Sequence, residues 1–193
     1  DLYSTDQNFK AKTEFQNTDP LTTAVTAPVK LRGSTAGGTG YQLVFTPGYE
    51  SIQMNADGEG AREHIVNSSY LKSEGTFMTG EDRVSVYSLD LRQDNSQISA
   101  DEDNDQTAQK YNISTTQMWF QNQKKSEILI GELGVTNNLA RGKNQFYWKY
   151  DVAATYMFDL TEKWSATPRI GLSYTDYNKA SESRKETNVT ATF

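Results

Sequence analysis

Polar and apolar residues alternate one by one along most of this 193-residue chain, and the pattern is clearest in residues 146–160, FYWKYDVAATYMFDL. One set of alternate residues there is wholly apolar, with aromatic rings near both ends and small residues between them. The other set contains Lys149, Asp151 and Asp159. Successive side chains of a β-strand point to opposite faces of a sheet, so this segment predicts a strand with one apolar face and one charged face.

The same alternation recurs along the whole chain and predicts about ten strands. They are expected around residues 9–15, 29–31, 41–49, 71–77, 85–91, 111–119, 129–135, 146–160, 164–174 and 187–193. Short turns (STAGGTG, TGED, NQKK and LTEK) alternate with longer polar connections at residues 17–28, 55–63, 95–106, 137–144 and 178–185. This rhythm predicts a single all-β domain over residues 1–193, an antiparallel up-and-down meander.

Composition and charge exclude several classes of protein. The net charge of −6 makes nucleic acid an unsuitable partner. There is no cysteine, which excludes disulfides and thiolate metal sites. No apolar run is long enough for a membrane-spanning helix.

Two architectures fit an alternating antiparallel sheet: a water-soluble sandwich and a membrane barrel. A sandwich normally buries Val, Ile and Leu, whereas aromatic residues here gather toward the strand ends and the apolar fraction is only 35%. Aromatic rings near both ends of long strands are typical of the two girdles of an outer-membrane barrel. We therefore predict an antiparallel up-and-down transmembrane β-barrel of about ten to twelve strands. Its lipid-facing girdle is expected to include Phe146, Trp148, Tyr150, Tyr156, Phe158, Trp164 and Tyr174.

Charged residues fall on the opposite set of alternate positions, and in a barrel they would line the lumen. The predicted pore-lining residues are Lys10, Lys12, Glu14, Lys30, Arg32, Glu50, Lys72, Glu74, Asp90, Arg92, Glu132, Lys149, Asp151, Arg169 and Glu186. Acids and bases are nearly balanced among them, which argues against a ring of one sign and a strong charge filter. About ten strands also predict a narrow passage, since eight leave an interior just filled by side chains.

The hairpin FYWKYDVAATYMFDLTEKWSATPRIGLSYTDY and the terminal strand TNVTATF resemble the closing strands of Gram-negative outer-membrane β-barrels. In size the chain is most similar to small monomeric porins such as the oligogalacturonate-specific family, which have about twelve strands. The resemblance implies an outer-membrane location among lipid and lipopolysaccharide. It also implies that the barrel assembly machinery reads Phe193, the C-terminal aromatic residue.

A catalytic site and a calcium site receive little support from the sequence. His64 has no acidic residue two positions before it and no serine two positions after it, so a loop position is expected rather than a general base, and we predict no enzyme activity. Asp101, Asp103 and Asp105 resemble the start of a calcium loop. Because the required glycine and bidentate glutamate are missing, a solvated loop is the preferred interpretation. No cofactor is expected.

The sequence thus predicts a channel for passive diffusion of ions or small polar solutes. The alternative is a non-conducting barrel that acts as a structural or surface-binding protein, such as an adhesin, a receptor or an assembly partner. The sequence leaves the oligomeric state open.

Overall fold

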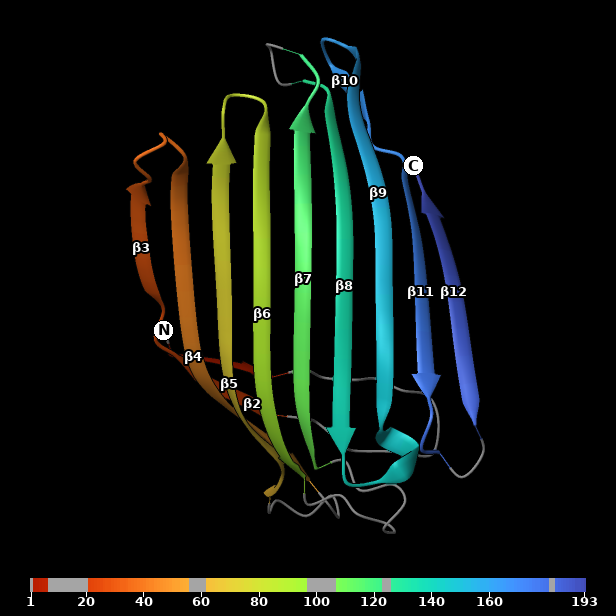
Figure 1. Cartoon of the computed structure of the whole chain (residues 1–193). Helices are drawn as coiled ribbons and strands as arrows, with labels where there is room; N and C mark the ends of the chain where they lie inside the picture. The colour runs from red at the N-terminus through yellow and green to blue at the C-terminus, as the bar shows by residue number, and fades with distance from the viewer. Residues whose placement is uncertain (1, 7–20, 56–61, 97–106, 123–125, 181–182) are drawn as a thin grey trace.

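One antiparallel sheet accounts for nearly all of the secondary structure (Figure 1). The computed structural model describes residues 2–6, 21–55, 62–96, 107–122, 126–180 and 183–193. No helix within these ranges is both long and apolar enough to cross a membrane. The elements are β1 (Leu2–Asp6), β2 (Leu21–Thr26), β3 (Val29–Ser34), β4 (Gly40–Asn55), β5 (Arg62–Thr79), β6 (Arg83–Ser96), β7 (Ala108–Phe120), β8 (Ile128–Ala140), a 3-10 helix η1 (Lys143–Gln145), β9 (Tyr147–Thr161), β10 (Trp164–Ala166), β11 (Arg169–Tyr177) and β12 (Arg184–Thr192).

Neighbouring strands follow the order β1-β2-β4-β5-β6-β7-β8-β9-β11-β12, and each pair is antiparallel. β3 continues β2 along the same edge of β4, and β10 and β11 share one edge of β9 in the same way. Pro28 and Pro168 separate the two halves of these strands, because proline has no N–H to donate to the ladder. The predicted all-β, antiparallel, up-and-down arrangement is confirmed.

The central strands are long. β4 to β9 contain 13 to 18 residues each, whereas strands of globular proteins average about five or six. Figure 1 shows them side by side, with the β3–β4, β5–β6, β7–β8 and β9–β10 connections at one end, here called the turn end. The other end, which includes η1, is called the loop end.

Three of the connections expected from the sequence differ in the structure. β2 lies inside the expected connection at residues 17–28, because its β-branched residues favour a strand that pairs with β4. β5 already begins at Arg62, so the backbone of His64 lies in a strand and the expected loop position is wrong. β8 extends to Ala140 and shortens the connection expected at residues 137–144. The strand expected at residues 9–15 lies outside the described residues.

The described sheet has two edges and is not closed. Among the described residues, β1 pairs only with β2 and β12 pairs only with β11. Barrel closure, which the sequence predicts, therefore stays a prediction.

The register can be tested because the chain has no natural cysteine. Ser88 of β6 lies directly opposite Ser114 of β7. Residues directly opposite each other in an antiparallel pair have Cα atoms about 4.5 to 5.5 Å apart, within the range of a disulfide. We expect the double variant Ser88→Cys/Ser114→Cys to form an intrachain disulfide, detected by thiol alkylation and mass spectrometry. The control pair Ser88→Cys/Thr116→Cys is displaced by one pleat and should stay reduced; the opposite result would contradict the register.

Candidate functional site: the polar face of the sheet

The pairing register keeps the two sets of alternate residues on separate faces across the whole sheet. A single transverse row on one face joins Leu43, Gly75, Tyr87, Thr115, Leu133, Val152, Leu172 and Val189. The neighbouring row on the other face joins Val44, Glu74, Ser88, Ser114, Gly134, Asp151, Ser173 and Asn188. The two surfaces are called the apolar face and the polar face below.

Large hydrophobic side chains stand uncovered on the apolar face. Leu133 is 58% exposed, Ile113 63%, Ile170 60% and Val189 69%, although all four belong to long paired strands. Buried hydrophobic residues, in contrast, are few within the described ranges: Ala24, Ala108 and Phe146. Within the described part of the chain, no second layer of protein covers this extended apolar surface.

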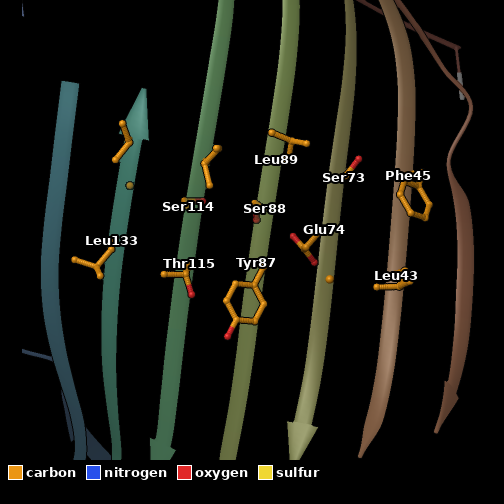
Figure 2. A pocket seen from close by; sticks show the side chains of 14 residues that line it. Leu43, Phe45, Ser73, Glu74, Tyr87, Ser88, Leu89, Ser114, Thr115 and Leu133 are labelled. Atoms are coloured by element: carbon orange, nitrogen blue, oxygen red, sulfur yellow. The ribbon is translucent and has the colours of Figure 1, made fainter. Parts of the chain in front are cut away.

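A shallow apolar groove of about 560 Å³ crosses this face over β4 to β8. Figure 2 shows Leu43 and Phe45 on β4, Tyr87 and Leu89 on β6, and Leu133 on β8 around it. Ser73 and Gly75 on β5 and Ser114 and Thr115 on β7 lie between these larger side chains. The groove is thus a depression in the apolar surface.

Aromatic rings on the apolar face occur toward both ends of the strands. Trp148, Tyr150 and Tyr174 contact one another near the loop end, with ring centroids 6.4 Å apart in each neighbouring pair. Tyr156 and Phe158 stack at 5.3 Å near the turn end. Trp164, also near the turn end, is 72% exposed.

Phe146 departs from its predicted girdle position. It follows η1 and precedes β9, and only 7% of it is exposed. Lys179 lies over its ring, 4.0 Å from the centroid. β9 begins at Tyr147, one residue later than the sequence pattern implies, so an exposed girdle position for Phe146 is wrong.

All predicted lumen residues that the structure describes share the polar face. They are Lys30, Arg32, Glu50, Lys72, Glu74, Asp90, Arg92, Glu132, Lys149, Asp151, Arg169 and Glu186. Lys10, Lys12 and Glu14 lie outside the described residues, as do the calcium candidates Asp101, Asp103 and Asp105. Among the described residues no group of His, Cys, Asp and Glu could hold a metal ion.

Asp94 is the centre of a charged cluster that joins four strands near the loop end. Only 4% of Asp94 is exposed. Its Oδ1 accepts hydrogen bonds from Ser68 Oγ and Arg92 Nε, both at 2.6 Å, and its Oδ2 lies 2.9 Å from Lys110 Nζ. Arg92 also donates to Ser68 and pairs with Glu50 at 3.0 Å. The cluster satisfies both carboxylate oxygens of Asp94, as a buried charge requires.

Other ion pairs on this face are more exposed. Arg169 forms a bidentate pair with Glu132 near the turn end. Lys149 Nζ lies 3.0 Å from Asp151 Oδ1 on the same strand. Asp90 differs, because its buried Oδ1 has no hydrogen-bond partner among the described residues.

A hollow of about 390 Å³ lies over β7 to β12 on the polar side. Gly134, Ala153 and Gly171 contribute to its floor, and the Glu132–Arg169 pair and Asp151 border it. Hydroxyl and amide groups provide most of its other polar contacts. The hollow offers a water-compatible surface in the middle of the sheet.

Sequence reasoning missed Asp94, Lys110 and Ser68. The expected strands end at residue 91 and begin at residue 111, and the expected connection covers residues 95–106, so Asp94 and Lys110 belong to neither. Asp90, Arg92 and Asp94 are two residues apart from one another, and this spacing could have placed Asp94 on the polar face.

The chain matches no protein-family model, and no curated protein or solved structure is significantly similar to it.

The cluster makes Asp94 more important for stability than the other acids of this face. We expect Asp94→Asn to lower the free energy of unfolding by about 1 to 3 kcal/mol, because charged hydrogen bonds from Arg92 and Lys110 are lost. The matched variant Asp151→Asn breaks a pair whose side chains are 40% exposed, so its effect should stay below about 1 kcal/mol. Urea unfolding followed by tryptophan fluorescence measures both. Equal effects would contradict a special role for Asp94.

Proposed function

We propose that this chain forms an outer-membrane β-barrel channel of a Gram-negative bacterium through which ions or small polar solutes diffuse passively. The observation that supports this most is the uncovered apolar face opposite a face of charged and hydroxyl groups. Water-soluble monomers rarely expose apolar patches larger than a few hundred Å². Lipid on one side and water on the other satisfies both faces at once.

Strand length supports the same proposal. A tilted strand needs about 9 to 11 residues to cross the hydrocarbon layer, and β4 to β9 exceed this. The rings of Trp148 and Tyr150 near one end and of Tyr156 and Phe158 near the other suit the two membrane interfaces. On β8 and β9 the exposed apolar residues between them, such as Leu133 and Val152, are aliphatic.

The proposed barrel closes by pairing β12 with β1. Strand direction alternates along the ten strands from β1 to β12, so the two outer strands run in opposite directions. They can therefore join as an antiparallel pair, which removes both open edges. The turn end would then face the periplasm and the loop end the exterior. Phe193, fully exposed beyond β12, would be the residue that the barrel assembly machinery reads.

A closed barrel of this kind would enclose the polar face. Its hydroxyl groups and paired charges can replace part of the hydration shell of a passing solute. The hollow over β7 to β12 gives this surface room for water.

A non-conducting barrel is the second candidate, and the ion pairs favour it. Glu50, Arg92, Asp94 and Lys110 link neighbouring strands and occupy space on the polar face. If such pairs filled the lumen, the chain would act through its loop end as a surface-binding or structural protein.

Membrane insertion can be tested by placing the same charge on either face of β8. We expect Leu133→Lys on the apolar face to prevent folding into lipid vesicles, since a lysine on the lipid side near the midplane costs about 2 to 4 kcal/mol. Thr136→Lys on the polar face should fold normally. The measurement is the heat-modifiable shift in gel migration after incubation with vesicles. A water-soluble monomer that tolerates Leu133→Lys would refute the membrane proposal.

Conduction is tested in planar bilayers. We expect discrete, salt-dependent current steps from the wild-type chain. Arg169→Gln leaves Glu132 without its cation and should shift the reversal potential in a salt gradient toward cation selectivity. Lys163→Gln, in the β9–β10 turn, removes the same charge outside the strands and should shift the potential less. A folded but silent wild-type barrel would support the non-conducting alternative.

A further inference from the structure

One transverse row of the polar face is made of large side chains. It runs near the loop end through register partners on β5 to β9 and continues onto β11 and β12. Its large members are Tyr70, Arg92, Lys110, Tyr147, Tyr177 and Arg184, and Asn138 completes it on β8. This row is called the belt below.

Contacts between neighbours hold much of the belt together. Arg92 and Lys110 meet at the carboxylate of Asp94. On the other side, the rings of Tyr147 and Tyr177 lie 5.5 Å apart, and the guanidinium of Arg184 lies 4.0 Å from the Tyr177 ring. Side chains fixed in this way keep their positions across the sheet better than isolated long side chains do.

Small side chains become frequent farther toward the turn end. The next row still contains Lys72 and Lys149. The row beyond it contains Ser88, Ser114, Gly134 and Ser173, together with Glu74, Asp151 and Asn188. The hollow of about 390 Å³ includes much of this second row in its lining, and no belt residue lines it.

A second hollow, of about 290 Å³, borders the belt on its loop side. Arg92, Lys110 and Asn138 of the belt line it together with Ile52, Val66 and Gln145. The belt thus separates two hollows, one toward the loops and one toward the middle of the sheet.

Each cation of the belt has a carboxylate partner. Arg92 pairs with Glu50 at 3.0 Å and Lys110 with Asp94 at 2.9 Å. Arg184 pairs with Glu186, also at 3.0 Å. The belt and its partners therefore form no ring of one sign, which strong charge selection requires.

We infer that the belt is the narrowest level of the lumen and limits passage by size rather than by charge. This inference rests on the proposed channel function. It places the selective level near the loop end, at Tyr147 and Tyr177, and not at the Lys149–Asp151 pair of the adjoining rows. Small hydrated ions and small uncharged solutes would pass, and bulky solutes would stop before the wider middle section.

The double variant Tyr147→Ala/Tyr177→Ala tests the inference in planar bilayers. We expect single-channel conductance to rise, on the order of two-fold, because a narrow segment in series limits the current. The reversal potential in a salt gradient should stay near the wild-type value, since every belt cation keeps its carboxylate. The single variants Tyr147→Ala and Tyr177→Ala should show smaller rises and keep the test available if the double variant does not fold.

The matched control is Tyr150→Ala/Tyr174→Ala. These two tyrosines form the equivalent ring contact on the opposite, apolar face of the same two strands. The control loses the same atoms and should leave the conductance unchanged. An equal rise in both double variants, or no rise in the belt variants of a conducting wild type, overturns the inference alone. A silent wild type overturns the proposed channel and the inference with it.

Discussion

Polar and apolar residues alternate along each strand, which places two chemically different surfaces on opposite faces of the sheet. The rest of the structure depends on this constraint. A strand places adjacent side chains on opposite faces, so a slip of one residue in any pair would move charges among the hydrophobic side chains. The observed register avoids this over the long paired stretches from β4 to β12, and shifts occur only near strand ends, at Ile52/Gln53 in the β4–β5 pair and at Trp164/Ser165 in the β9–β10 pair. Because register and alternation agree along long strands, the sheet has an uncovered apolar face and a polar face with its own ion pairs.

The uncovered face sets the conditions under which the chain can be stable. Burial of apolar surface normally supplies the main free energy of folding, yet few hydrophobic side chains are buried in the described part of the sheet. The backbone ladder and the polar clusters hold the strands together, but they leave residues such as Ile113 and Val189 exposed. In the proposed membrane setting, lipid supplies the missing apolar contact.

Much of the fold could be predicted from the sequence, because alternation is a local property of each strand. It gave the all-β class, the approximate number of strands and the shared face of Glu50, Arg92 and Arg169.

Strand ends could not be predicted as well. Polar residues such as Asp94 suit a loop and the polar face of a strand equally, and only pairing with the neighbouring strand decides between them. Phe146 shows the reverse case, since its pattern suits a strand while η1 turns the chain just before it. Contacts across several strands, including the meeting of Arg92 and Lys110 at one carboxylate, depend on register and have no local signal.

The two proline interruptions have a mechanical consequence. Pro28 lies between β2 and β3, and Pro168 lies between β10 and β11, so each interrupts the strand that is second from an edge of the sheet. Hydrogen bonds from Ala27 to Pro47 and from Tyr156 to Pro168 hold the chain against its neighbour at these breaks. A strand that lacks one donor bends more easily than an uninterrupted one. β2 and β3, and likewise β10 and β11, can therefore differ in direction, while β4 and β9, with which they pair, continue without a break.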